Sequence, residues 1–172
     1  MLTAEPTAKL VLTGDEIHQK IVRLAFEIYK NNFEEQTIFL AGIQERGYLF
    51  ASQLASQLRS ISPIKVELIS VEVDKEAPQQ SNISLTIPAE QLNKKVVVLV
   101  DDVLNTGRTL AYALKPFLNS EVKKLQTAVL VDRGYPQFPV SATYIGYALA
   151  TTLQELVEVK FEGDLPVAVY LR

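Results

Sequence analysis

Two adjacent carboxylates, Asp101 and Asp102, follow the apolar run Val-Val-Val-Leu-Val and precede a short polar loop that contains a glycine. Carboxylate oxygens can accept hydrogen bonds from vicinal hydroxyls or hold a hydrated Mg²⁺. The loop at 105–109, Asn-Thr-Gly-Arg-Thr, opens an expected helix, and the N–H groups and hydroxyls at a helix start can hold a phosphate. This order predicts a ligand with sugar hydroxyls at one end and a phosphate at the other. The simpler alternative is a buried strand that ends in an ordinary acidic turn, but the complete string favours the ligand site.

The elements that position these groups follow from the hydrophobic periodicity. Thr13 and Glu16 form a capping-box pattern ahead of apolar residues at helical spacing, which predicts a helix over 15–31. The unbroken apolar run at 96–100 is typical of a central parallel strand that is covered on both faces. Pro116 predicts a distortion or boundary near the end of a helix over 107–118. One more helix is expected at 48–58, and further strands at 37–41, 64–73, 83–87 and 126–131.

Alternating strands and helices predict an α/β domain with a mostly parallel sheet. Ligands of such sheets lie beyond the carboxyl ends of the strands. The loops that follow residues 41, 73, 100 and 131 all come after expected strands. We therefore expect these four loops to meet at one edge of the sheet.

Length, composition and charge limit the other possibilities. A chain of 172 residues fits one domain, expected over 1–172, with a sizeable core. No apolar run approaches the roughly 18 residues of a membrane span, and the first residues lack the pattern of a signal peptide. The absence of cysteine excludes a disulfide scaffold and thiol chemistry, and it fits a cytoplasmic protein. A net charge of −3 argues against a surface that attracts nucleic acids in general.

The string VDDVLNTGRTL resembles the 5-phosphoribosyl-1-pyrophosphate (PRPP) signature of type I phosphoribosyltransferases. Residues 42–47 resemble the pyrophosphate loop of that family, and residues 125–134 resemble the strand and turn that follow the PRPP helix. Residues 139–146 resemble the segment that leads into the base-binding region. The best resemblance is to the PyrR-type family, bifunctional regulators of pyrimidine operons with uracil phosphoribosyltransferase activity.

The resemblance implies the type I phosphoribosyltransferase fold, in which helices flank a mostly parallel sheet and a small base-binding hood is added. It also implies an enzyme that uses PRPP and Mg²⁺ to convert a nucleobase, with uracil favoured, into the nucleoside monophosphate and pyrophosphate. The partners would be PRPP, the base and further copies of the chain in a homodimer or higher homo-oligomer.

Roles for individual residues follow from the same resemblance. Asp101 and Asp102 would bind the ribose hydroxyls and Mg²⁺. Gln44, Glu45 and Arg46 would bind the pyrophosphate, although Arg46 could instead pair with Glu45 or lie at a subunit contact. The 5′-phosphate would be held by residues of the polar loop, namely Asn105, Thr106, Gly107, Arg108 and Thr109. Arg108 could equally be a solvated residue of the first helical turn whose backbone alone contributes.

The base site is less determined. Asn105 stands where purine-specific relatives carry an aspartate proposed as general base, and asparagine cannot take a proton, which speaks against hypoxanthine and guanine. Asp132 and Arg133 would contact the base or form a structural pair that turns at Gly134. Tyr147 would stack on the base, or it could be a core or interface tyrosine.

Two segments depart from the family pattern. PyrR-type relatives carry a mobile loop that closes over PRPP. The corresponding segment here, residues 73–82, is short and has Lys75 as its only cation. Reduced activity, or a silent PRPP-binding protein, is therefore an alternative. Residues 135–154, where PyrR-type relatives carry basic RNA-binding residues, contain no charge. Because Lys and Arg supply most of the affinity for phosphate backbones, we do not expect RNA as a partner.

Overall fold

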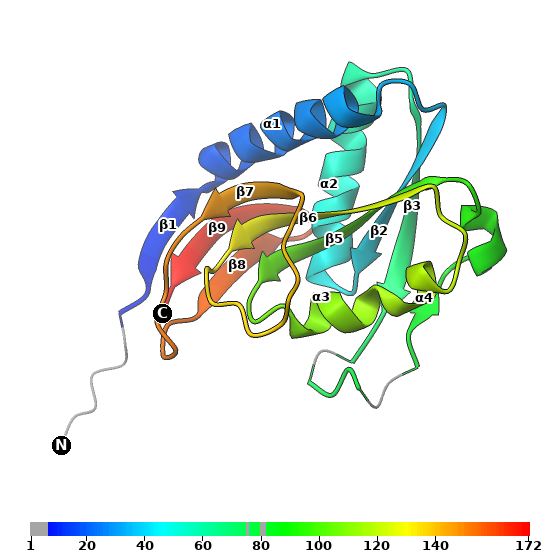
Figure 1. Cartoon of the computed structure of the whole chain (residues 1–172). Coiled ribbons are helices and arrows are strands. Elements are labelled where there is room, and N and C mark those ends of the chain that lie inside the picture. The colour runs from blue at the N-terminus through cyan, green and yellow to red at the C-terminus, as the bar shows by residue number, and fades with distance from the viewer. Residues whose placement is uncertain (1–6, 75, 80–81) are drawn as a thin grey trace.

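The computed structural model describes residues 7–74, 76–79 and 82–172, and its largest element is a six-stranded sheet (Figure 1). Its strands are β2 (Thr37–Ile43), β3 (Lys65–Glu72), β4 (Ser84–Leu85), β5 (Val96–Leu104), β6 (Lys124–Asp132) and β7 (Tyr144–Ala148). They lie in the order β4-β3-β2-β5-β6-β7. All neighbours are parallel except β4, which pairs antiparallel with β3. The predicted α/β class with a mostly parallel sheet is confirmed.

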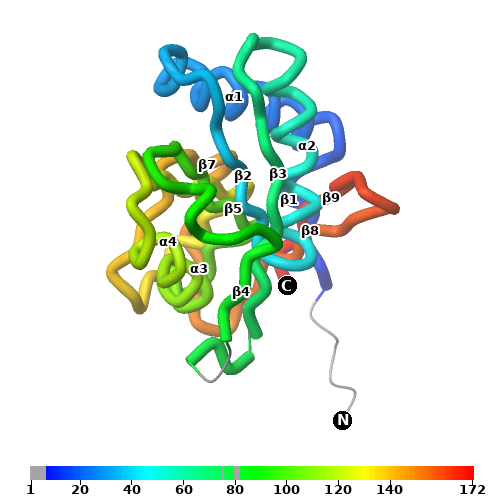
Figure 2. Tube along the Cα trace, turned by 90° about the vertical axis from the view of Figure 1, so that its right-hand side faces the viewer, coloured from blue at the N-terminus to red at the C-terminus, as the bar shows by residue number. Residues whose placement is uncertain are grey.

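Helices cover both faces of this sheet. The apolar side chains of α1 (Gly14–Asn32) and α2 (Arg46–Ile61) share one buried cluster with alternate residues of the strands. Those of α3 (Arg108–Ala113) and α4 (Lys115–Leu118) share a second cluster on the opposite face. In Figure 2, α3 and α4 accordingly lie on one side of β2 and β3, and α2 lies on the other. A short 3-10 helix, Ala89–Leu92, precedes β5.

The long first helix begins as its sequence predicts. Thr13 N donates to Glu16 Oε2 (3.0 Å), and Glu16 N donates to Thr13 Oγ1 (3.3 Å), which completes the capping box. This exchange satisfies backbone donors that a helix start otherwise leaves unpaired.

Among the helices of the described residues, none combines the length and apolar character needed to cross a membrane.

The expected helix at 107–118 is divided at Leu114 into α3 and α4. Pro116 lies in the first turn of α4, and it has no N–H to donate to the carbonyl of Tyr112, as a continuous helix would require. The expected boundary at this proline is confirmed.

The strand bounds differ from the prediction, most of all at β5. β5 continues past the apolar run through both aspartates, because Asp101 and Leu104 still pair with Val129 and Asp132 of β6. The expected strand at 83–87 is reduced to the two residues of β4, which pair with Val71 and Glu72 at the end of β3.

A separate antiparallel sheet of three strands forms the hood. It contains β1 (Lys9–Thr13), β8 (Val157–Glu162) and β9 (Leu165–Leu171) in the order β1-β9-β8. The hood therefore joins segments from near the two ends of the chain, and β8 lies against β5. Figure 1 shows this sheet at the left, beside the carboxyl ends of β5 and β6.

Candidate functional site

The carboxylates of Asp101 and Asp102 are held by the backbone of their own strand. Asp102 N donates to Asp101 Oδ1 (2.9 Å), and Val103 N donates to Asp102 Oδ1 (2.9 Å). The two residues are only 4% and 6% exposed. Because the Oδ1 of each aspartate accepts a hydrogen bond from the next backbone N–H, each carboxylate is held in a fixed orientation at the end of β5. This geometry prepares acceptor oxygens for a polar ligand.

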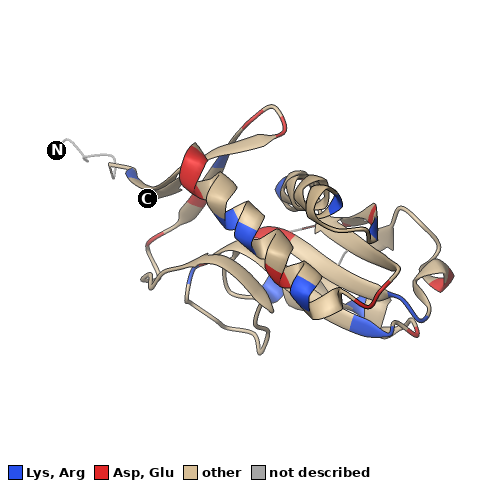
Figure 3. Cartoon of the chain, turned by 90° about the horizontal axis from the view of Figure 1, so that it is seen from above, with Lys and Arg blue, Asp and Glu red and all other residues tan. Residues whose placement is uncertain are grey.

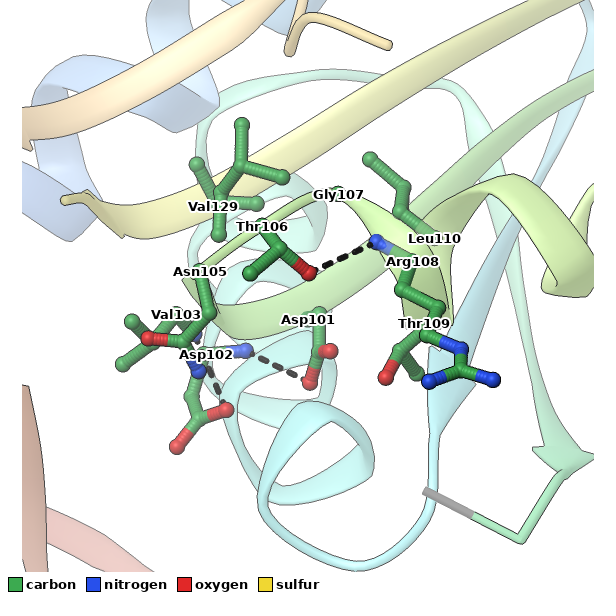
Figure 4. A pocket seen from close by; sticks show the side chains of 11 residues that line it. Asp101, Asp102, Val103, Asn105, Thr106, Gly107, Arg108, Thr109, Leu110 and Val129 are labelled. Carbon is green, nitrogen blue, oxygen red and sulfur yellow. Dashed lines mark hydrogen bonds between the residues drawn. The ribbon is translucent and has the colours of Figure 1, made fainter. Parts of the chain in front are cut away.

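The polar loop turns sharply after β5 and starts α3. Gly107 has a φ of 86°, a left-handed conformation that residues with a β-carbon rarely adopt. Thr106 Oγ1 accepts a hydrogen bond from Arg108 N (3.3 Å), as the dashed line in Figure 4 shows. The Thr106 carbonyl accepts two more, from the N–H groups of Gln137 (2.9 Å) and Phe138 (3.0 Å). The loop is thus fixed from behind by the segment that follows β6.

The aspartates and the loop enclose one cavity of about 170 Å³ (Figure 4). Its lining comprises residues 101–110 and Val129. A second cavity of about 180 Å³ shares residues 104–107 and adds Asp132, Gly134, Pro136, Val140 and Ser141. The structure therefore brings together seven of the predicted site residues in the first cavity: Asp101, Asp102, Asn105, Thr106, Gly107, Arg108 and Thr109.

The glycine loop between β2 and α2 meets this site from the adjacent strand. A β-carbon at Gly47 would stand 2.8 Å from Asp101 Oδ1 and 2.9 Å from the Val100 carbonyl oxygen. A β-carbon at Gly42 would overlap the backbone of Tyr48. Gly47 therefore allows the loop to pack tightly against β5, and Gly42 allows β2 to lie close to the backbone at the start of α2. The sequence predicted the loop at this edge, and its direct contact with Asp101 comes from the structure.

The three predicted pyrophosphate residues lie on this loop in different settings. Gln44 Nε2 donates to Glu72 Oε1 (3.1 Å), and the peptide bond between Gln44 and Glu45 is cis. Arg46 is exposed in the first turn of α2. Within the described parts of the chain, no ion pair joins Arg46 to Glu45, so that alternative for the arginine is not realised.

Arg108 extends toward the segment that corresponds to the closing loop. Its Nη2 donates to Gln79 Oε1 (2.8 Å), and its buried Nε has no hydrogen-bond partner. The side chain is therefore not simply solvated, which was the alternative for this residue. Lys75, the only cation of the 73–82 segment, lies outside the described residues.

The three predicted base-binding residues separate in the structure. Asp132 lines the second cavity and accepts a hydrogen bond from Gly134 N (2.9 Å) through Oδ1. Arg133 is buried and bonded to residues 151–153. Tyr147 packs against the core that α1 covers, with Lys20 Nζ 5.8 Å from its ring centre. Neither Arg133 nor Tyr147 lines the two cavities.

Sequence reasoning did not identify Gln79, Thr151 or Leu153 as neighbours of site residues. No local pattern marks them, because their contacts span 18 to 29 residues of sequence. Gly47 carried a usable signal, since it follows Gly42 at the start of an expected helix.

Comparison with known proteins adds an independent result. The family described as "Phosphoribosyl transferase domain" matches residues 10–159. Curated relatives named "Bifunctional protein PyrR" include one from Fusobacterium nucleatum, which is 34% identical over 162 residues, 90% of this chain and 92% of the relative. Another, from Streptomyces coelicolor, is 34% identical over 164 residues, 91% of this chain and 85% of the relative.

Solved structures agree on the fold. A hypoxanthine-guanine phosphoribosyltransferase from Bacillus anthracis superposes with a TM-score of 0.75 at 18% identity, covering 95% of this chain and 96% of that one. A hypoxanthine phosphoribosyltransferase from Trypanosoma cruzi gives 0.71 at 18% identity, covering 87% and 84%. The predicted type I phosphoribosyltransferase fold is confirmed, and at these identities the likeness concerns the fold alone.

Proposed function

This chain belongs to the type I phosphoribosyltransferase family, and we propose that it transfers the phosphoribosyl group of PRPP to a nucleobase, namely uracil. The observation that carries the proposal is the single cavity in which buried Asp101 and Asp102 stand beside the polar loop at 105–109. A ligand with ribose hydroxyls and a 5′-phosphate matches both halves of this lining.

In the proposed reaction, the bond from ribose C1 to the pyrophosphate oxygen breaks and a bond from C1 to the base nitrogen forms. Positive charge develops on the ribose as the pyrophosphate leaves, so positioning and electrostatics supply most of the catalysis. Asp101 and Asp102 accept hydrogen bonds from the ribose hydroxyls. Thr106 and Thr109 bind the 5′-phosphate with their hydroxyls and backbone N–H groups. The base gives up its proton to solvent, since Asn105 cannot accept it.

A magnesium ion fits this donor set only together with its ligand. In the described parts of the chain, no three acidic or histidine side chains gather as a metal site. Mg²⁺ is commonly held by one or two carboxylates, waters and substrate phosphates, and Asp101 and Asp102 can provide the carboxylates. When bound, the ion would neutralise the charge of the leaving pyrophosphate.

Arg46 is the candidate cation on the pyrophosphate side. It is exposed at the start of α2, and Gly47 next to it contacts Asp101. A pyrophosphate attached to a ribose at the aspartates would extend toward this loop. The guanidinium could then donate two parallel hydrogen bonds to phosphate oxygens.

The choice of uracil rests on the family resemblance and on two sequence features. Asn105 replaces the acid of purine-specific relatives, and the base side of the site draws on the uncharged segment 135–154. A small neutral pyrimidine suits the second cavity, in which Pro136 and Val140 lie beside the Asp132 carboxylate, an acceptor for a ring N–H. The hood strand β8 lies against β5, the strand of the acidic pair, and we infer that the base binds on this side of the site.

The decisive experiment measures pyrophosphate release from PRPP and Mg²⁺ in the presence of uracil, cytosine, hypoxanthine, guanine or orotate. We expect turnover with uracil alone, and its loss when a chelator removes Mg²⁺. Turnover with a purine instead would overturn the choice of base. Binding of PRPP without turnover of any base would leave the silent binding protein, and absence of PRPP binding by a folded sample would reject the proposal.

The relatives' name, "Bifunctional protein PyrR", supports a second candidate, a regulator that binds pyrimidine leader RNA. Figure 3 displays the charged residues, and the segment 135–154 carries none of them. The second candidate therefore ranks below the enzyme. An RNA gel-shift at moderate salt separates the two.

A further inference from the structure

Arg133 is a charged side chain buried at the end of β6, where it is only 5% exposed. Its guanidinium reaches the crossover that leads from β7 to the hood strand β8. Nε donates to Thr151 Oγ1 (3.0 Å), and Nη2 donates to the carbonyls of Thr152 (2.8 Å) and Leu153 (3.3 Å). Tyr135 covers the guanidinium, with its ring centre 5.2 Å away. These contacts satisfy a charge that would be costly to bury unpaired.

The backbone of Arg133 is hydrogen-bonded to the end of β5, the strand that carries the acidic pair. Arg133 N donates to the carbonyl of Leu104 (3.0 Å), the last residue of β5 before Asn105. Thr151 Oγ1 in turn donates to the Arg133 carbonyl (2.9 Å). Residue 133 therefore connects the strand that carries Asp101 and Asp102 to the start of the hood.

The crossover presents apolar side chains to solvent. Leu153 is 67% exposed and Leu156 is 59% exposed, between the end of β7 and the start of β8. These two leucines therefore add little apolar packing that would hold the crossover in place, whereas Arg133 bonds directly to residues 151–153.

We propose that Arg133 is a positioning residue that holds the crossover at 151–153. It thereby sets the distance between this crossover, the base-facing surface of the proposed site, and β5, the strand that carries Asp101 and Asp102. The inference rests on the proposed function for its catalytic consequence, but the positioning itself is a property of the folded chain. In this role Arg133 does not touch the base. Arginine suits it, because its planar fork addresses a hydroxyl and two carbonyls at once, whereas a lysine ammonium is a single point.

The first test measures amide hydrogen exchange in Arg133→Met, which keeps much of the apolar stem and removes every donor. We expect exchange across 149–157 to accelerate about tenfold or more, because hydrogen bonds to charged groups are lost. Exchange in β2 and α2 should stay unchanged. Equal protection of the crossover in both proteins would overturn the proposal.

Arg23→Met is the matched control. Arg23 also donates to two carbonyls, those of Ile145 (3.2 Å) and Gly146 (2.5 Å), but it does so from α1 at the outer edge of β7. We expect this variant to leave the crossover's exchange and the ligand affinities unchanged. An equal effect of Arg23→Met on 149–157 would assign the result to general loosening and contradict a specific role of Arg133.

The second test uses ligands that differ only in the base. Arg133→Met should weaken uridine monophosphate about tenfold relative to ribose 5-phosphate, because the base-facing surface is displaced while the phosphate loop remains. In turnover, KM for uracil should rise while KM for PRPP changes little. Equal losses for the two ligands would reject the positioning role.

Thr151 supplies a milder variant if Arg133→Met fails to fold. Thr151→Val should reproduce part of both effects, and Thr151→Ser, which retains the hydroxyl, should restore wild-type behaviour. Equal behaviour of Val and Ser at position 151 would contradict the hydrogen-bonding role.

If the wild-type protein neither binds uridine monophosphate nor turns over PRPP, the proposed function fails, and the exchange experiment still decides the role of Arg133.

Discussion

The α-carbon of Gly47 lies directly against the carboxylate of Asp101, with space for hydrogen only. A β-carbon at position 47 would meet Asp101 Oδ1 at 2.8 Å and the carbonyl oxygen of Val100 at 2.9 Å. The second contact is with backbone, which a side-chain rotation cannot relieve. The contact of Gly47 with Asp101 and Val100 is therefore a shared wall, which belongs both to the candidate pyrophosphate loop and to the candidate ribose site.

Gly47→Ala should displace either this loop or Asp101. We expect a loss of about 1–3 kcal/mol in the free energy of unfolding, as for other overpacked sites, and at least tenfold weaker PRPP binding by calorimetry. Gly163→Ala is the control, since Gly163 has a φ of 59° but nothing within 4 Å of an added β-carbon. It should cost about 1 kcal/mol of stability and leave PRPP binding intact. Normal PRPP affinity in Gly47→Ala would contradict the shared wall.

Replacing Asp101 and Asp102 together by Asn should weaken PRPP far more than inorganic phosphate. Only PRPP presents ribose hydroxyls, and each lost bond to a charged acceptor is worth about 1.5–3 kcal/mol. We therefore expect PRPP affinity to fall by about 100-fold or more, with little change in the affinity for phosphate. Thr109→Val should weaken all phosphate ligands alike. Unaltered PRPP binding by the double Asn variant would make the carboxylates structural.

Arg46→Gln should raise the inhibition constant of pyrophosphate about tenfold, because a charge-assisted contact is lost. Stability should change by less than about 0.5 kcal/mol, since the side chain is exposed. Arg59→Gln, in the last turn of the same helix, removes a bond to the Val66 carbonyl (2.8 Å) and serves as the charge-matched control. Equal inhibition constants in these two variants would exclude Arg46 from the pyrophosphate site.

Tyr144 should make the stability of the fold sensitive to alkaline pH. Burial raises its pKa above the ordinary value of 10.0, against the hydrogen bonds that its hydroxyl accepts from Asn31 and Asn32. The hydroxyl donates its own proton to Gln126 Oε1 (2.9 Å). Because the folded pKa is the higher one, the stabilisation is complete below pH 10 and is lost as the pH rises through the folded pKa. Urea unfolding of wild type and Tyr144→Phe should differ by about 1–2 kcal/mol at pH 8 and by less at pH 11. A constant difference would contradict the raised pKa.

The chain should not bind RNA with the affinity of a regulator. The segment 135–154 has no cation, and the net charge is −3. Weak contact with dissociation constants of roughly 10⁻⁴ to 10⁻⁶ M is expected, falling as salt increases and independent of sequence. Sub-micromolar, sequence-selective binding to pyrimidine leader RNA in a gel-shift at physiological salt would restore the regulatory function.

Local sequence predicted the elements that carry the candidate site. The periodic apolar residues of α1, the capping box at Thr13 and the boundary at Pro116 depend on neighbours within about four residues. The strands β2, β3, β5 and β6 were found from apolar runs, and their order along the chain was enough to place four loops at one edge. The acidic pair and its polar loop needed no long-range information either.

The hood and the side-chain partners were decided by tertiary structure. β1 pairs with β9 across nearly the whole chain, and a strand that short shows no period strong enough to predict it. The contacts of Arg133 with 151–153, of Arg108 with Gln79, and of Gly47 with Asp101 join residues 18 to 54 positions apart. Sequence alone therefore determined which groups could do chemistry and on which edge they stand. Which of them face the cavity depended on the packing of strands and loops against one another, because each side chain's direction is set by neighbours that are distant in sequence.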